Sequence, residues 1–391
     1  MKSGKVFKRM VVFITIITLI IGSCILSYSK SSSTIKLGVN LELSGAVAQY
    51  GQKALEGIKM ATDEINKKGG ILGKKIELVI FDNKSDKTEA LNIATRLATK
   101  ENVLAILGCT TSGATKSAAV ASMKYKIPII SPTATDDKLT VDERTGKTKA
   151  YVFRVCFNDS FQGDVMATFA LKTLKVKSVA IIYDASSDYS KGLEKNFKVA
   201  FTKGGGKIVA EEAFAKSEQE FSGILTKIKA KKPEAIFAPV YYDEAGLIIK
   251  QARELGIKIP IMGGDGFDDP KVAEKAGSTY ANNVYFSTHY SGQDPDKKVQ
   301  DFIKKYKQLY KNEPNAFVAT SYDLVYLVAD AIKRANSTTD REKLRKALEN
   351  TKNFVGVTGV ITINKYHNAQ KAAVIIELKN GVQVFKQKIN P

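Results

Sequence analysis

The chain has 391 residues, of which 44% are hydrophobic and 26% are charged. This composition is typical of globular proteins and excludes a disordered chain, and the length is comfortable for two domains. The formal net charge is +20, but the basic residues are scattered and include no arginine-rich run. Because no aromatic RNA-binding motif or zinc-finger spacing accompanies them, the charge predicts a lysine-rich surface and no nucleic-acid partner.

The N-terminus has the three parts of a secretory signal. A basic stretch is followed by an apolar run over 10–21, and two small residues then precede Cys24. The apolar run is too short for a comfortable membrane span. The letters Ile-Gly-Ser-Cys that end at Cys24 resemble a bacterial lipobox, which implies that this cysteine is lipidated. We therefore predict a lipoprotein signal peptide at 1–23 and a tether at 24–33 on the outer face of the membrane, with an uncleaved membrane anchor as the alternative.

From Ile35 onward, short apolar runs alternate with amphipathic segments. Strands are predicted at 35–39, 76–81, 103–107 and 127–130, and helices at about 52–67, 87–101 and 113–124. In the first of these helices, apolar residues recur along one face at helical spacing: Ala54, Ile58, Ala61 and Ile65. Asp86, with Glu89 three positions later, predicts a capping box at the start of the next helix. The alternation as a whole predicts parallel βαβ units.

A second set of elements repeats the scheme. Strands are predicted at 178–183, 207–210, 235–238 and 260–262, and helices near 161–174, 190–203, 219–231 and 243–256. An extended segment at 151–158 joins the two sets, and a strand at 283–287 leads into helices near 296–311 and 316–335. The tail contains short strands within 359–363 and 372–386, where an Asn380-Gly381 turn favours a hairpin.

These elements predict an α/β fold of two doubly wound, Rossmann-like lobes joined by a multi-crossing hinge, with a cleft between them. The first lobe is assigned to 34–153 and 286–363, and the second lobe to 154–285 and 364–391. Ligands of open parallel sheets bind at the carboxyl ends of the strands. We therefore expect the binding site in the loops that follow the strands, where the two lobes face each other.

Six stretches of the body carry a family resemblance. They are LSGAVAQYG at 43–51, INKKGGILGKKIEL at 65–78, GCTTSGAT at 108–115, IPIISPTATDDKLT at 127–140, FSGILTKIK at 221–229 and GGDGFDDP at 263–270. Together they resemble branched-chain amino acid-type ABC transporter substrate-binding proteins, which are leucine-binding-protein-like and have the type I periplasmic binding protein fold. The resemblance implies capture of an amino acid, branched-chain or otherwise apolar, between the lobes. It also implies delivery of that ligand to ABC permease subunits by a monomer that needs no cofactor.

A free amino acid needs hydrogen-bond donors for its carboxylate. Ser112 follows a strand and lies at the start of a helix, where a hydroxyl and unpaired backbone N–H groups form a carboxylate receptor. Thr133 and Thr135, in the loop after the neighbouring strand, can supply further donors and acceptors. The alternatives are a plain helix cap for Ser112 and an ordinary strand-to-helix loop for the two threonines.

The ammonium group of the ligand needs an acceptor, and Asp265 is the candidate because glycines flank it and the family carries an acid at this position. An Asx-turn aspartate that makes only local bonds is the alternative. The resemblance also implies four aromatic cleft residues, whose rings suit stacking on the ligand: Tyr50, Tyr189, Tyr241 and Phe267. Tyr242 could replace Tyr241, since alternation turns only one of the two toward the cleft.

Catalytic and metal-binding motifs are not found in the sequence. The two histidines, His289 and His367, lack metal-ligand spacing, and no G-x-S-x-G elbow or G-x-G-x-x-G turn occurs. Cys109 and Cys156 are most simply buried thiols, with a disulfide between them as the open alternative. We therefore predict a protein that is not an enzyme and that binds no metal. A ligand sensor of the same fold and a binder of a short amide or urea are the alternative functions.

Overall fold

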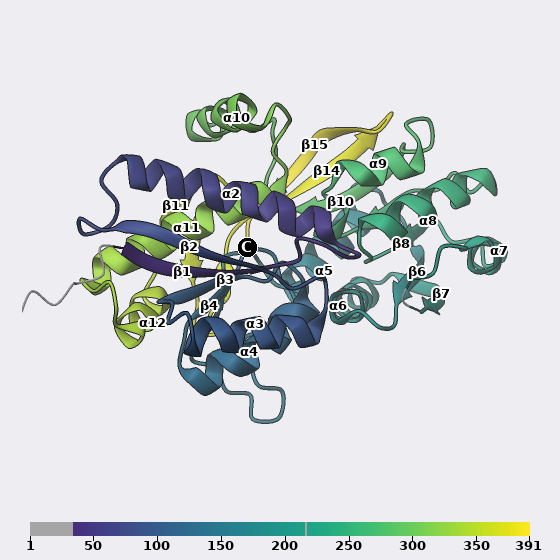
Figure 1. Ribbon diagram of the computed structural model, residues 1–391. Helices are drawn as coiled ribbons and strands as arrows, with labels where there is room; N and C mark the ends of the chain where they lie inside the picture. Colours follow the sequence, from purple (N-terminus) through teal and green to yellow (C-terminus); the bar gives the residue numbers. More distant parts are fainter. Residues whose placement is uncertain (1–33, 216) are drawn as a thin grey trace, which may run out of the picture.

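The computed structural model describes residues 34–215 and 217–391 (Figure 1). The predicted signal peptide, Cys24 and the tether lie outside these residues. Within them the chain forms a mixed α/β fold with two large sheets, which confirms the predicted fold class. None of the helices in the described ranges combines the length and the apolar character that crossing a bilayer requires.

The first sheet has five parallel strands in the order β2-β1-β3-β4-β5. The strands are β1 (Thr34–Leu41), β2 (Lys75–Asp82), β3 (Ala105–Gly108), β4 (Ile129–Ser131) and β5 (Val152–Arg154). One side is covered by α2 (Ala48–Lys67) and α11 (Ala316–Ala335), and the other by α3 (Lys87–Thr99) and α4 (Ser112–Tyr125) (Figure 1). We call this sheet and its helices the first lobe.

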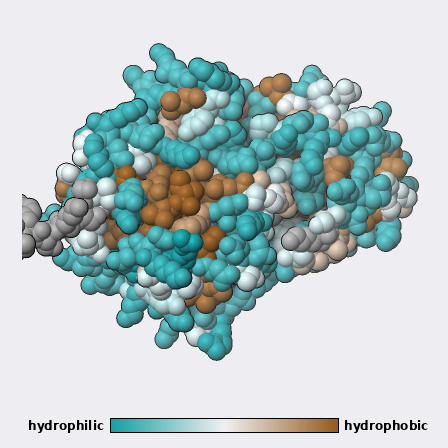
Figure 2. All heavy atoms as spheres, viewed as in Figure 1, coloured by the Kyte–Doolittle hydropathy of each residue, from teal (hydrophilic) through white to brown (hydrophobic). Residues whose placement is uncertain are grey.

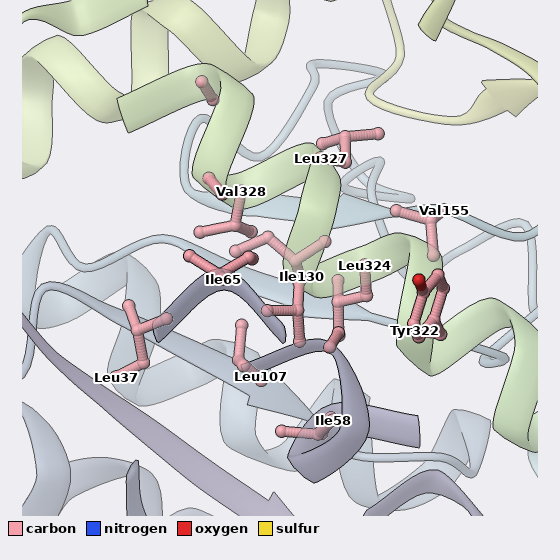
Figure 3. Packing of buried hydrophobic residues seen from close by; sticks show 14 of the residues in the cluster. Leu37, Ile58, Ile65, Leu107, Ile130, Val155, Tyr322, Leu324, Leu327 and Val328 are labelled. Atoms are coloured by element: carbon pink, nitrogen blue, oxygen red, sulfur yellow. The ribbon is translucent and has the colours of Figure 1, made fainter. Parts of the chain in front are cut away.

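The core of the first lobe follows the helical periodicity of the sequence. The four apolar positions expected to share a face of α2 are all buried. In Figure 3, Ile58 and Ile65 of α2 lie in one cluster with Leu107 of β3 and Leu324 of α11. The helix pair therefore packs on the sheet as one apolar layer, which fixes the positions of the loops that follow β1 and β3.

The second sheet has seven strands in the order β15-β14-β10-β9-β8-β6-β7. The parallel strands are β6 (Ser178–Asp184), β7 (Lys207–Phe214), β8 (Ala235–Phe237), β9 (Ile261–Gly263) and β10 (Val284–Thr288), and the antiparallel ones are β14 (Ala373–Lys379) and β15 (Val382–Ile389). Its helices are α5 (Asp159–Thr168), continued by a π-helical turn at Phe169–Thr173, α6 (Asp188–Lys203), α7 (Ser222–Ala230), α8 (Tyr242–Glu254) and α9 (Pro270–Ala276). We call this sheet and its helices the second lobe.

The remaining elements complete the first lobe. They are α10 (Lys297–Tyr310), α12 (Arg341–Glu349) and a small antiparallel sheet of β11 (Phe354–Gly356), β12 (Gly359–Ile363) and β13 (Ala369–Gln370). The sequence did not predict α9, α12, β11 or β13. Each of these is short, and α12 has so many charged residues that its single apolar stripe is interrupted.

Three local predictions are confirmed, the first of them in part. The Asp86 carboxylate accepts a hydrogen bond from the N–H of Glu89 at 2.8 Å, which confirms the cap of α3. The Asp86 N–H, however, donates to the carbonyl of Asn83 at 2.9 Å, and the second bond of a capping box is not formed. Asn380 and Gly381, between β14 and β15, have positive φ angles of 50° and 77°, as a tight hairpin turn requires. Cys109 and Cys156 are free and buried.

The chain passes between the lobes at three places: after β5, after β10 and between β13 and β14. The predicted lobe boundaries at 153/154 and 285/286 fall inside β5 and β10, so these two crossings begin where the strands end. The division of the chain by residue ranges otherwise stays a prediction. These three crossing segments are the hinge in the sections below.

The face of the molecule in Figure 2 is largely hydrophilic, with an apolar area left of centre over the strands of the first lobe. β2 is an edge strand of that lobe, and its residues Leu78, Val79, Ile80 and Phe81 are only half-buried. Unlike the central strands, β2 therefore leaves apolar side chains partly in contact with water.

Candidate ligand-binding site

A small cavity lies between the lobes, beyond the carboxyl ends of their parallel strands. It is lined by Tyr50, Thr110, Thr111, Ser112, Thr133, Tyr189, Tyr241, Asp265, Gly266 and Phe317. Six of these residues carry sequence-predicted ligand contacts, and they come from both lobes. This is the position at which open α/β sheets bind small molecules.

The loop after β3 forms one wall of the cavity and is fastened by a buried acid. Thr110 and Thr111 each donate a backbone N–H, at 3.0 and 3.1 Å, and a hydroxyl, at 2.6 and 2.7 Å, to the carboxylate of Glu42. Glu42 directly follows β1 and is fully buried. Its four hydrogen bonds replace the hydration that the carboxylate loses on burial. Sequence reasoning missed Glu42, for which the only signal was an acid just after a strand.

Ser112 begins α4 and faces the cavity. Its hydroxyl oxygen accepts the N–H of Asp136 at 3.2 Å, which leaves the hydroxyl proton for another acceptor. The cap position itself is occupied by Thr111, so the predicted alternative of a plain cap at Ser112 does not describe the helix start. The first N–H groups of α4 have no acceptor within the helix. Together with the hydroxyl they form a receptor for an anionic group.

The two predicted threonines differ in what their hydroxyls do. Thr133 lines the cavity, but its hydroxyl donates to the carbonyl of Thr110 at 2.8 Å. The Thr135 hydroxyl is buried and has no hydrogen-bond partner among the described residues. Arg154, which sequence reasoning missed, holds this loop by donating to the carbonyls of Ala134 at 2.9 Å and Asp136 at 2.7 Å.

Asp265 lies on the opposite wall, in the 3-10 turn η2 (Asp265–Phe267) after β9, and is only 4% exposed. Gln162 donates its amide to one carboxylate oxygen at 2.9 Å, and Nε2 of His289 lies 3.3 Å from the other. Burial lowers the pKa of His289, which makes the neutral ring the favoured form. Asp265 therefore faces neutral donors, and in the described chain no lysine or arginine pairs with it.

A second buried carboxyl group lies near Asp265. Asp159 begins α5 and donates its N–H to the carbonyl of Thr135 at 2.8 Å, while neither of its carboxyl oxygens has a hydrogen-bond partner in the described chain. Burial raises the pKa of Asp159 well above its ordinary value, and Asp137 and Asp136 add to the rise. Sequence reasoning missed Asp159 because an acid in the first turn of a helix has an ordinary structural explanation.

Four aromatic rings surround the cavity. Tyr50 is stacked on Phe317 with centroids 4.1 Å apart, and Tyr189 is stacked on Tyr241 at 5.1 Å. The Tyr50 hydroxyl donates to the carbonyl of Gly266 at 2.5 Å, which joins the two lobes across the cavity. Phe317 begins α11 and was not predicted.

Two aromatic predictions remained open, the choice between Tyr241 and Tyr242 and the role of Phe267, and the positions of these side chains decide both. Tyr241 lines the cavity, whereas the hydroxyl of Tyr242 donates to the carbonyl of Ala46 at 3.0 Å. Phe267 does not line the cavity. Its ring turns back over β9, next to Gly263, and packs against Phe286 in the core of the second lobe. We therefore leave Phe267 out of the candidate site. The sequence could not decide its direction, because a residue that completes a tight turn can face either the cleft or the sheet.

The described residues contain no group of three or more His, Cys, Asp or Glu side chains arranged to hold a metal ion. What the cavity presents is hydrogen-bond donors in the first lobe, the Asp265 carboxyl group in the second, and aromatic surfaces between them. This combination is complementary to a small molecule with a negative end, a positive end and an apolar body.

Comparison with known proteins places the chain in a family. The family model described as periplasmic binding protein matches residues 34–383. The chain belongs to the periplasmic binding protein family. This binding protein is 31% identical over 334 residues to a Leu/Ile/Val-binding protein of Rhizobium johnstonii, an alignment that covers 84% of this chain and 87% of the relative.

Two solved structures are similar to this binding protein over nearly their whole length. A branched-chain amino acid transporter substrate-binding protein of Streptococcus pneumoniae, in complex with isoleucine, is 40% identical, with a TM-score of 0.85 and coverage of 92% of this chain and 100% of that one. A leucine-binding protein of Thermotoga maritima is 37% identical, with a TM-score of 0.86 and coverage of 91% and 99%. Membership in this family implies an extracytoplasmic location for the two lobes.

Proposed function

We propose that this binding protein captures a free amino acid with an apolar side chain, of the branched-chain class, and delivers it to the permease of an ABC importer. One observation carries the proposal: a buried cavity that presents a helix start with the Ser112 hydroxyl on one wall and the Asp265 carboxylate on the other. The names of the relatives, which refer to leucine, isoleucine and valine, support the same class of ligand. No catalytic step is part of the proposal.

The two ends of the ligand would be recognised by different lobes. The carboxylate would accept hydrogen bonds from Ser112 and the first N–H groups of α4, and the unpartnered hydroxyl of Thr135 is placed beside them. The ammonium would donate to Asp265, with the carboxyl of Asp159 close by. Because neither buried acid has a cationic partner in the described chain, an ammonium would supply the missing charge.

Closure of the lobes follows from this arrangement. A ligand bound by the first lobe alone gains the contacts of Asp265, Tyr189 and Tyr241 only when the second lobe approaches. Binding therefore favours the closed form by the difference between these contacts and those in the open form. The closed form is the one that would dock on the permease, as a monomer that holds one ligand.

The proposal includes export and attachment to the membrane. The apolar run before Cys24 and the lipobox-like letters that end there support cleavage and lipidation of this cysteine. The polar segment at 24–33 would then hold the two lobes away from the membrane surface, within reach of the permease.

Calorimetry with the twenty amino acids tests the proposal. We expect isoleucine, leucine or valine to bind in the micromolar range, about −8 kcal/mol, at one site per chain. Asp265→Asn should weaken this binding by about 100-fold or more, because it removes one partner of a buried charge pair. The control is Asp301→Asn, which removes an exposed carboxylate of α10 and should bind as the parent does.

Two outcomes would contradict the proposal. In one, Asp265→Asn binds the amino acid as tightly as the parent. In the other, no amino acid binds while acetamide or urea does, which would reassign the cavity to short amide ligands.

A further inference from the structure

His289 lies in the hinge, next to the proposed ammonium site. It follows β10 directly, its side chain is 1% exposed, and its ring packs on Phe157 with centroids 3.8 Å apart. Nε2 lies 3.3 Å from the Asp265 carboxylate, and Nδ1 has no hydrogen-bond partner among the described residues. The ring therefore has one polar contact, and that contact is the carboxylate proposed to bind the ligand.

The charges around the ring determine what its protonation does. Two titratable groups act on it directly, Asp265 from η2 and Lys371 from the crossing before β14, and Cys156 from the crossing after β5 interacts with both of these groups. Burial lowers the pKa of His289, and Asp265 opposes this shift. Burial also lowers the pKa of Lys371, to about 8, and raises that of Cys156 to about 12. His289 has the ordinary pKa closest to neutral among these groups, and burial moves this pKa downward, so its ring gains a charge only on the acid side of neutrality.

We propose that His289 is a positioning residue for ligand capture: its neutral Nε2–H orients the Asp265 carboxylate, and its protonated form competes with the ligand ammonium for that carboxylate. The proposal rests on the proposed function of Asp265. With Gln162 holding the other oxygen, the histidine fixes the plane of the carboxylate. Because His289 is part of the hinge, the same contact links the position of the hinge to the state of the site.

The direction of the pH effect follows from linkage. A bound ammonium adds a positive charge near His289 and so favours the neutral ring in the complex. Affinity is therefore full above the pKa that His289 has in the empty protein, and it falls below that pKa by up to about tenfold per pH unit. A free amino acid keeps both of its charges between pH 5 and 8, so the ligand itself contributes no change in this window.

The test uses calorimetry with L-isoleucine at pH 8, 7, 6 and 5 on the parent and two variants. His289→Gln keeps a neutral donor, and we expect it to bind within about threefold of the parent at pH 8 but to lose less affinity than the parent as the pH falls to 6. His289→Leu removes the donor, and we expect about tenfold weaker binding at pH 8. The parent should also release more protons on binding at pH 6 than His289→Gln, measured as a dependence of the heat on the buffer, because the raised pKa of Asp159 contributes equally to both proteins.

Melting temperatures of the three proteins identify any folding defect. The inference is overturned if His289→Gln keeps the pH dependence and proton release of the parent, or if a folded His289→Leu binds as tightly as the parent at pH 8. If the parent binds no amino acid at pH 8, the proposed function itself fails and the inference fails with it. Normal binding by the parent with no response to pH overturns the role of His289 alone.

Discussion

At the scale of single residues, the candidate site is defined by polar groups that lack partners. Asp159 and the Thr135 hydroxyl are buried next to each other, and the hydroxyl opposes the rise in the pKa of Asp159. The two groups fall short of full hydrogen-bond geometry, and neither has another partner in the described chain. Buried polar groups are normally satisfied, and leaving one without a partner costs about 1–3 kcal/mol. A bound amino acid could satisfy both groups, because its ammonium can donate to Asp159 and its carboxylate can accept from the Thr135 hydroxyl.

Asp159→Asn tests this arrangement. We expect isoleucine binding to weaken by about tenfold or more, because a neutral amide oxygen binds an ammonium more weakly than a carboxylate does. The free energy of unfolding should stay unchanged or rise by up to about 1–3 kcal/mol at pH 8, because the variant no longer carries an unpaired buried acid. Calorimetry measures the first quantity and urea unfolding the second.

The sign of the pH effect on Asp159 is also fixed. A carboxyl group whose pKa is raised in the folded protein contributes its full stability below its unfolded pKa, and this contribution is lost as the pH rises through the folded pKa. The stability gain of Asp159→Asn should therefore grow from about pH 4 upward. A variant that unfolds more easily yet binds as the parent does would refute this view of Asp159.

The residues found from sequence share one property. Ser112 and Asp265 lie in the loops that follow β3 and β9, and the rule for parallel sheets places such loops in the cleft. Asp159 and Gln162 lie on α5, where nearness to the ligand depends on how distant segments pack. His289 directly follows β10, but its contact with Asp265 depends on packing in the same way. Sequence patterns carry no such distances.

At the scale of elements, the first lobe depends on the close approach of two helices. Gly57 of α2 faces α11, and a Cβ at this position would lie 2.2 Å from the carbonyl oxygen of Val318. The obstacle is backbone, so it cannot turn aside as a side chain could. The spacing of α2 and α11, and with it the position of Tyr50 on α2, therefore requires a glycine here.

Gly57→Ala should lower the free energy of unfolding by about 1–3 kcal/mol, the usual cost of excess volume in a packed interface. The matched control is Gly223→Ala in α7, where a Cβ would meet nothing within 4 Å. This control should be neutral or stabilising by up to about 1 kcal/mol, because alanine is the better helix former. Urea unfolding measures both values, and equal effects of the two substitutions would contradict the proposed close packing.

Most elements could be predicted because their patterns are long. The helices α2 and α11 repeat apolar residues over 20 residues each, and the strands of both sheets are bounded by turn residues. The short helices α9 and α12 were missed because 7 and 9 residues contain too few turns to establish a period. The sequence predicted parallel strands but not their order in each sheet, because that order depends on tertiary packing.

At the scale of the whole molecule, a few polar contacts hold the lobes together. Besides the Tyr50 hydroxyl, these contacts include an ion cluster where α6 of the second lobe meets α3 and α4 of the first. The Asp188 carboxylate lies 2.8 Å from Nζ of Lys87 and 3.4 Å from Nζ of Lys116. Gly113 of α4 leaves room for this cluster, because a Cβ there would lie 3.1 Å from the Asp188 carboxylate.

The ion cluster also has an electrostatic role in closure. Asp188 is in the first turn of α6, and Gly113 is in the first turn of α4, so closing the lobes brings two positive helix ends together. The Asp188 carboxylate lies between these ends and offsets their repulsion. Ion pairs near the surface contribute only about 0.2–1 kcal/mol each. The cluster therefore stabilises the closed form slightly, and ligand binding decides the equilibrium between the open and closed forms.

Asp188→Asn should therefore weaken isoleucine binding by about twofold to tenfold without changing the melting temperature of the empty protein, because two half-buried pairs between the closed lobes are lost. Since salt screens such pairs, the affinity of the parent should fall toward that of the variant between 0.05 and 0.5 M NaCl, while the variant changes little. Glu254→Gln is the control, because its pair with Lys250 at 4.0 Å lies within α8 and does not join the lobes. An Asp188→Asn protein with the affinity and salt dependence of the parent would mean that the lobes close without help from this cluster.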